Sequence, residues 1–301
     1  MSKITLLDGS IGQELVRRCT DPATPFWSTS VMIKHPHLLR DLHRAYADAG
    51  ATVMMTNTYA VLYDRFEQMG DLGVPIPGIV SMALDAACAI RELDEHVDRR
   101  VAGALGPLMA SYRPDRCPPP DEAERMYADS VAHLVERADL LIFETMSSVE
   151  QAEGAMRAGD ASGLPYWIAA TVEDFDGTKL RSGEALSDLA LLLSRYRPQA
   201  LLINCSRPEA VTDGLAILAK LGLPFGAYAN GFTKISDGFL KDAPTVDVLE
   251  KRSDLGPSAY ADFAMTWVDM GATIIGGCCE VGPAHISEIA SRLRAGGHQI
   301  T

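Results

Sequence analysis

Short apolar segments recur along the chain, and most are followed by a longer segment whose apolar residues have helical spacing. Eight of the short segments predict strands, at residues 4–7, 51–55, 101–105, 140–143, 166–172, 200–204, 224–229 and the run from residue 272 that leads to Cys278. Helices are predicted near residues 10–12 and at 38–49, 78–95, 121–137, 148–158, 184–196, 208–221 and 258–270. This alternation is typical of an α/β protein with the (β/α)₈ TIM barrel fold, and a doubly wound sheet is the alternative.

Residues whose side chains can take part in binding or catalysis stand directly after the predicted strands. In a barrel the carboxyl ends of all strands lie on one face, which is the face that carries active sites. Taken singly, Asp and Asn also cap helices and make turns. Their joint placement favours a catalytic face built from Asp8, Asn57, Glu144, Cys205, Asn230, Cys278 and Cys279.

The cysteines at two of these strand ends indicate a metal site. Cys205 ends one apolar run, and Cys278 and Cys279 follow Gly276 and Gly277 at the end of another. Three thiolates suit Zn²⁺ and leave a fourth tetrahedral position open for a substrate. The alternatives are that Cys205 is a small buried hydrophobe, that Cys278 and Cys279 form a redox pair, or that the barrel binds zinc or a sulfonium metabolite without turnover.

Chain length, net charge and the distribution of apolar residues limit the classes of protein that fit this sequence. The chain has 301 residues and no low-complexity linker, so we expect one domain over residues 1–301. A net charge of −13 disfavours a nucleic-acid or anionic-membrane partner, and no apolar stretch predicts a membrane span or a signal peptide. We therefore expect a soluble cytoplasmic enzyme with small-molecule partners. The pattern says nothing of oligomeric state. The remaining cysteines, Cys19, Cys88 and Cys117, are expected to be structural or incidental, and no histidine is expected to be a metal ligand.

Motifs along the whole length of the chain resemble those of one enzyme family. The matching segments lie at residues 7–15, 26–28, 49–51, 56–59, 106–107, 143–145, 204–206 and 276–279. The most specific feature is an Asn-Cys after one strand together with a Gly-Gly-Cys-Cys in the last. In these motifs the chain is similar to the homocysteine S-methyltransferases, zinc enzymes with a (β/α)₈ fold that move a methyl group onto the thiol of homocysteine.

The resemblance implies roles for individual residues. It makes Cys205, Cys278 and Cys279 the zinc ligands, and it places Asp8 and Glu144 at the amino group of homocysteine. The backbone N–H groups that follow Asp8, from Gly9 onward, would hold the carboxylate, as the start of a helix can. Aromatic faces for a cationic methyl donor are expected from Trp27, Tyr59 and Phe26, unless these rings belong to the core. Asn57 and Asn230 complete the expected substrate-binding residues.

The implied activity is zinc-dependent methyl transfer from an onium donor to homocysteine, which gives methionine. Betaine is disfavoured as the donor, because Ala60 and Thr145 stand where betaine-using members place tyrosines, and no folate or cobalamin domain is present. S-methylmethionine or S-adenosylmethionine is left by elimination. The segment Tyr228-Ala229-Asn230 lacks the Pro-Asn common in the family, so a related thiol or selenol acceptor, or another donor, is the alternative.

Overall fold

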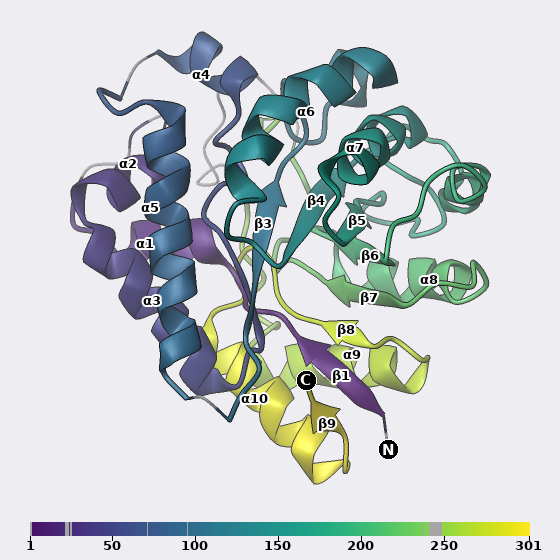
Figure 1. The fold of residues 1–301 in the computed structure, drawn as a ribbon. Coiled ribbons are helices and arrows are strands. Elements are labelled where there is room, and N and C mark those ends of the chain that lie inside the picture. Colours follow the sequence, from purple (N-terminus) through teal and green to yellow (C-terminus); the bar gives the residue numbers. More distant parts are fainter. Residues whose placement is uncertain are drawn as a thin grey trace.

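A parallel sheet curls into a barrel with helices around its outside (Figure 1). The computed structural model describes residues 2–21, 24, 26–70, 72–94, 96–236, 238–240 and 249–301. The barrel strands are β1 (Lys3–Leu6), β2 (Val53–Met55), β3 (Arg100–Leu105), β4 (Leu140–Met146), β5 (Tyr166–Ala170), β6 (Ala200–Asn204), β7 (Phe225–Tyr228) and β8 (Ile274–Ile275). The strands from β2 to β8 pair in chain order, β8 pairs with β1, and a parallel bridge from Leu7, just after β1, to Val53 of β2 closes the barrel. The predicted (β/α)₈ barrel is confirmed.

Helices follow most of the strands, as in other α/β barrels. The α-helices are α1 (Ile11–Arg18), α2 (Trp27–Lys34), α3 (Pro36–Ala49), α4 (Tyr63–Met69), α5 (Ile76–Cys88), α6 (Pro120–Leu134), α7 (Val149–Ser162), α8 (Pro208–Leu218), α9 (Pro257–Asp269) and α10 (Pro283–Ala295). Short 3₁₀ turns are η1 (Ala89–Glu92), η2 (Pro114–Arg116) and η3 (Leu186–Leu191). Among the described residues, no helix is both long and apolar enough to cross a bilayer.

The strands alternate between the barrel interior and the layer under the helices, because successive side chains of a strand point to opposite faces. Leu140 and Ile142 belong to the interior cluster, whereas Leu141 and Phe143 pack with the helices. The same alternation carries Glu144 to the inner side at the carboxyl end of β4. This parity explains why a carboxylate that ends an apolar strand reaches the mouth of the barrel.

One predicted helix is wrong. Residues 184–196 were expected to form a helix after β5, but the structure has only the 3₁₀ turn η3 there. Leu186, Leu189 and Leu192 are all buried and are spaced by three residues, which matches the three residues per turn of a 3₁₀ helix. The backbone just before them is held by an antiparallel bridge from Lys179 to Ala185.

Other differences concern element ends and additions. The helix expected at residues 78–95 is α5 followed by η1, and its last expected residue lies outside the described residues. The short helices α2 and α4 were not predicted. A ninth strand, β9 (Gln299–Ile300), pairs with Lys3 and Ile4 of β1, so the two chain ends lie side by side (Figure 1).

Candidate active site

A cavity of about 140 Å³ opens at the carboxyl ends of the strands. It brings together most of the residues that the sequence predicted from separate strands. The predicted site residues that line it are Gly9, Trp27, Asn57, Tyr59, Glu144, Cys205, Cys278 and Cys279. Asp8 and Asn230 are buried beside these residues but are not among those that line the cavity.

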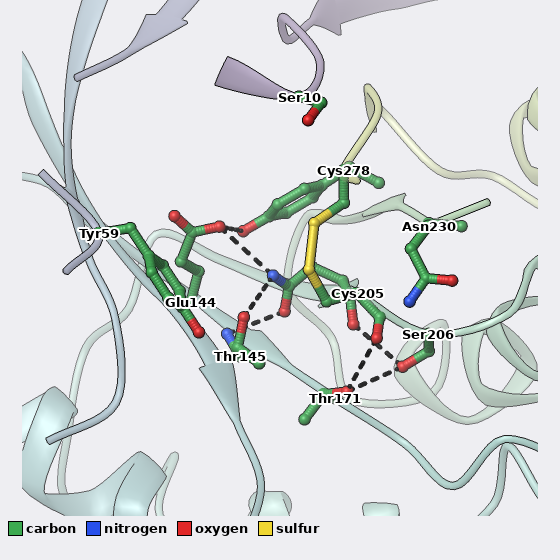
Figure 2. Close-up of a disulfide and its surroundings, with 12 residues drawn as sticks. Ser10, Tyr59, Glu144, Thr145, Thr171, Cys205, Ser206, Asn230 and Cys278 are labelled. Carbon is green, nitrogen blue, oxygen red and sulfur yellow. Dashed lines mark hydrogen bonds between the residues drawn. A yellow bond between two sulfur atoms is a disulfide. The ribbon is translucent and has the colours of Figure 1, made fainter. Parts of the chain in front are cut away.

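The three cysteines meet at one wall of the cavity. The sulfur atoms of Cys205, Cys278 and Cys279 all lie within 4.8 Å of one another. In this structure a disulfide joins Cys205 to Cys278, and Cys279 is a free thiol (Figure 2). The redox pair considered from the sequence, Cys278 with Cys279, is therefore not the pair that forms. Once the disulfide is reduced, three sulfurs this close together fit the thiolate set of a zinc ion.

The local backbone at these cysteines is unusual. Cys205 has a φ of 46°, in the left-handed region that non-glycine residues seldom adopt, and Thr145 and Glu280 share it with φ of 66° and 69°. Such conformations gather at functional sites, where the surrounding fold maintains them. Gly277 is required for a different reason, because a Cβ on it would lie 2.1 Å from Cγ1 of Val281. A glycine therefore lets the strand end approach the next loop just before the two cysteines.

Two buried carboxylates face the same region. Asp8 is fully buried; its Oδ2 accepts a hydrogen bond from the Met55 N–H at 2.8 Å, and its Oδ1 has no partner among the described residues. Burial raises the pKa of Asp8 well above its ordinary value, and the nearby charge of Glu144 adds to this. Burial also raises the pKa of Glu144 to about 7. Among the residues that the structure describes, no cation pairs with either carboxylate, so the site suits a cationic ligand group.

Two residues to which the sequence assigned no individual role support Glu144. Its Oε2 accepts hydrogen bonds from Tyr228 Oη at 3.2 Å and from Asn204 Nδ2 at 3.4 Å (Figure 2). Asn204 also accepts the Thr145 N–H through Oδ1 at 2.9 Å and donates to the Thr145 hydroxyl at 2.9 Å. Asn204 directly precedes Cys205 in the sequence, and this position next to a predicted metal ligand could have identified it as a site residue. Tyr228 lies inside an apolar strand, so the sequence pattern predicts only a core residue there.

The amino end of α1 faces the cavity. Ser10 stands at the N-cap position, and its hydroxyl donates to Gln13 Oε1 at 3.5 Å instead of accepting a backbone N–H of the first turn. Ile11, Gly12 and Gln13 of this turn line the cavity. Backbone N–H groups in such a turn can bind a carboxylate. Gly9 allows this placement because a Cβ there would lie 2.2 Å from the Val281 carbonyl oxygen.

Glu280 joins this helix end to the cysteine strand. Gln13 donates through Nε2 to Glu280 Oε1 at 2.5 Å, and the Glu280 N–H donates back to Gln13 Oε1 at 2.9 Å. Arg17 and Lys251 form ion pairs with the same carboxylate. These pairs, together with the hydrogen bonds, hold the pKa of Glu280 below its ordinary value despite partial burial. Glu280 therefore already has its cations, in contrast to Asp8 and Glu144.

Aromatic rings also line the cavity, and two of them, Tyr112 and Phe239, pack in one cluster with the three cysteines. Trp27 is the first residue of α2, with a φ of 48°, and it lines the cavity with Tyr59, Tyr112 and Phe239. The Arg65 guanidinium lies 5.6 Å from the centre of the Tyr59 ring, so one cation is already near that face. Phe26 packs 5.5 Å from Phe66 and is not among the residues that line the cavity. Tyr112 is a lining residue that the sequence did not suggest.

The two asparagines have structural partners. Asn57 accepts from the Ser28 hydroxyl at 3.0 Å and donates to the Ser28 carbonyl at 3.4 Å, which ties the start of α2 to the loop after β2. Asn230 accepts the Phe232 N–H through Oδ1 at 3.1 Å, and its Nδ2 has no partner among the described residues. Asn57 thus lines the cavity with its side chain already engaged.

Comparison with known proteins agrees with this arrangement. The family model described as homocysteine S-methyltransferase matches residues 5–293. The homocysteine S-methyltransferase of Escherichia coli (strain K12) is 30% identical over 305 residues, which cover 96% of this chain and 95% of that protein.

Two solved structures of the homocysteine methyltransferase MmuM from Escherichia coli are also similar. The metallated form superposes with a TM-score of 0.81 at 27% identity, and the match covers 97% of this chain and 96% of that one. The oxidized form superposes with a TM-score of 0.80 at 27% identity, covering 96% of each chain. The chain belongs to the homocysteine S-methyltransferase family.

Proposed function

We propose that this protein transfers a methyl group from a sulfonium donor, S-methylmethionine or S-adenosylmethionine, to the thiol of homocysteine, and that Cys205, Cys278 and Cys279 hold a zinc ion for this purpose. The observation that carries the proposal is the meeting of three cysteine sulfurs within 4.8 Å of one another in the cavity that Glu144 also lines. The family match supports the acceptor and the reaction class. We also take residues 1–301 as one domain, because the sheet that starts at β1 returns to it through β8.

The proposed pose of homocysteine follows from the charges around the cavity. Its ammonium would lie at Glu144 and Asp8, two buried carboxylates that form no ion pair within the described part of the chain. Its carboxylate would meet the first-turn N–H groups of α1. These two anchors would direct the side chain toward the cysteine wall. Asn204 and Tyr228 would act as positioning residues, because they orient the Glu144 carboxylate.

A zinc ion would supply the positive charge that keeps the homocysteine sulfur as a thiolate at neutral pH. In the transfer, a bond forms between that sulfur and the methyl carbon while the bond from the methyl carbon to the donor sulfonium breaks. The bonding electron pair goes to the donor sulfur, which becomes a neutral thioether, and the acceptor's thiol proton leaves to solvent. The protein contributes by holding both substrates in line in one cavity.

The donor would lie against the aromatic rings that line the cavity. Trp27, Tyr59 and Tyr112 present ring surfaces there, and such surfaces attract a sulfonium through its charge. The charge disappears as the methyl leaves, so the product is held less firmly than the substrate. The thiol ligands have to stay reduced, and we therefore place the working enzyme in a reducing compartment such as the cytoplasm.

The test is a methionine-formation assay on reduced, zinc-supplemented protein with homocysteine and a panel of donors: S-methylmethionine, S-adenosylmethionine and betaine. We expect turnover with a sulfonium donor and about one zinc at the three cysteines. Cys205→Ser should lose both, whereas Cys88→Ser, a half-buried cysteine on α5, is the matched control and should lose neither. A zinc stoichiometry that Cys205→Ser leaves unchanged would refute the ligand set, and no turnover with any donor would refute the reaction.

A further inference from the structure

A second group of metal-binding side chains lies outside the active-site cavity. The sulfur of Cys19, a carboxylate oxygen of Asp21 and a ring nitrogen of His35 all lie within 4.8 Å of one another. His35 Nε2 is 3.0 Å from Asp21 Oδ2, and the Asp21 N–H donates to Cys19 Sγ at 3.4 Å. The sequence suggested no role for any of them, because Cys19 and His35 are separated by a segment with no metal-binding motif.

Helix ends hold two of these residues in place. Cys19 directly follows α1, and its N–H donates to the Val16 carbonyl at 3.1 Å. His35 stands between α2 and α3; its N–H donates to the Val31 carbonyl at 2.7 Å, and its carbonyl accepts from Leu38 at 3.0 Å. The ligand atoms therefore project from backbone that secondary structure already orders, which lowers the cost of assembling a site.

We propose that Cys19, Asp21 and His35 bind a zinc ion, or another divalent transition-metal ion that prefers the same ligand types, at a site separate from the catalytic cysteines. Thiolate, imidazole and carboxylate are the three side-chain ligands that zinc takes in proteins, and bond lengths of about 2.0–2.3 Å bring such ligands to roughly 3.3–3.8 Å from one another. Small side-chain rotations from the present spacing are enough. An ion pair between His35 and Asp21 accounts for two of the residues but leaves the thiol without a function.

The surroundings suit a site that exchanges metal with solvent. The side chains of His35 and Asp21 are 35% and 39% exposed, so water can supply the fourth ligand. A thiolate and a carboxylate together attract a cation, and the chain as a whole carries a net charge of −13. Lys34 is the positive group that faces the small hollow beside Cys19 and Asp21. Its flexible ammonium can turn to solvent when a metal binds.

The position of the site connects it to the active-site cavity. Metal binding would join the end of α1 to the junction of α2 and α3. Trp27, the first residue of α2, lines both the hollow beside Cys19 and the large cavity. Occupancy would therefore fix the helix that presents Trp27. The metal site itself does not depend on the proposed methyl transfer.

The test is Co²⁺ and Zn²⁺ binding by the reduced full-length protein. Wild type should bind two zinc ions, and Cys19→Ser should bind one. In a Cys205→Ser background, the remaining Co²⁺ should show a thiolate charge-transfer absorption that Cys19→Ser abolishes, and His35→Gln should weaken its binding by about tenfold or more. Cys88→Ser and His96→Gln are controls that remove the same side-chain types elsewhere and should change nothing.

Metal stoichiometry separates this proposal from the proposed function. A single zinc in wild type that Cys205→Ser removes completely would overturn the second site and leave the catalytic one intact. A single zinc that Cys19→Ser removes and Cys205→Ser retains would support the second site and refute the catalytic ligand set. Thiolate absorption that survives Cys19→Ser in the Cys205→Ser background would also overturn the proposal.

Discussion

Replacing Glu144 with glutamine should make the free protein more stable and the enzyme worse at binding homocysteine. Burial raises the pKa of Glu144 from 4.5 to about 7. Since one pKa unit corresponds to about 1.4 kcal/mol, keeping this carboxylate ionised costs the folded protein about 3 kcal/mol above neutral pH. Glutamine keeps an acceptor for Tyr228 and Asn204 but carries no charge, so the variant avoids this cost.

The stability gain from Glu144→Gln should depend on pH. The folded-state pKa is raised, so protonated Glu144 favours the fold, and that contribution is lost as pH rises from about 4.5 to about 7. The stability gain of Glu144→Gln should therefore be small near pH 4.5 and approach about 3 kcal/mol near pH 8. Denaturant unfolding across this range measures it. Glu150→Gln, at an exposed position on α7, removes the same charge and should stay within about 0.5 kcal/mol of wild type.

Binding should change in the opposite direction. The variant leaves only Asp8 for the homocysteine ammonium, and losing one partner of a buried charge pair costs about 2 kcal/mol or more, which is roughly 30-fold in KM. Zinc content should be unchanged, and a simple thiol without an amino group should react as before. A variant less stable than wild type near pH 8, or one with an unchanged KM for homocysteine, would refute the reasoning.

Three further predictions address other residues. Incubation with methyl-labelled donor alone should leave no label on Cys205, Cys278 or Cys279; label that is later chased onto homocysteine would contradict direct transfer. His43 is fully buried, its ring nitrogens have no hydrogen-bond partner among the described residues, and burial lowers its pKa to about 4. Wild type should therefore lose about 3 kcal/mol of stability as pH falls from about 6.5 to about 4, and unfolding of His43→Leu should not show this slope. Gly9→Ala should raise the KM for homocysteine and lower Tm, because its Cβ would meet the Val281 carbonyl at 2.2 Å, whereas Gly256→Ala, with nothing within 4 Å, should do neither.

Local sequence pattern was enough to determine the barrel and the face that carries the chemistry. Apolar strand runs alternate with helical segments, and parallel strands joined by helices bring all their carboxyl ends to one side. Any polar residue placed just after a strand must then lie at that mouth. This reasoning located Glu144 and the three cysteines at a common cavity before their distances were known. It failed at residues 184–196, where spacing of leucines by three residues fits a 3₁₀ turn that a helical pattern also resembles.

Tertiary structure alone decided which of these groups touch. The Tyr228 hydroxyl reaches Glu144 because strand alternation turns both inward, although 84 residues separate them. Glu280 pairs with Arg17 and Lys251, whereas Glu144 has no ion pair with any described residue, and the sequence does not reveal this difference. Cys19, Asp21 and His35 likewise meet only because α1 and the α2–α3 junction pack together. Hydrogen bonds and metal sites depend on separations of a few ångströms between distant segments, and these are set by packing and backbone conformation rather than by local pattern.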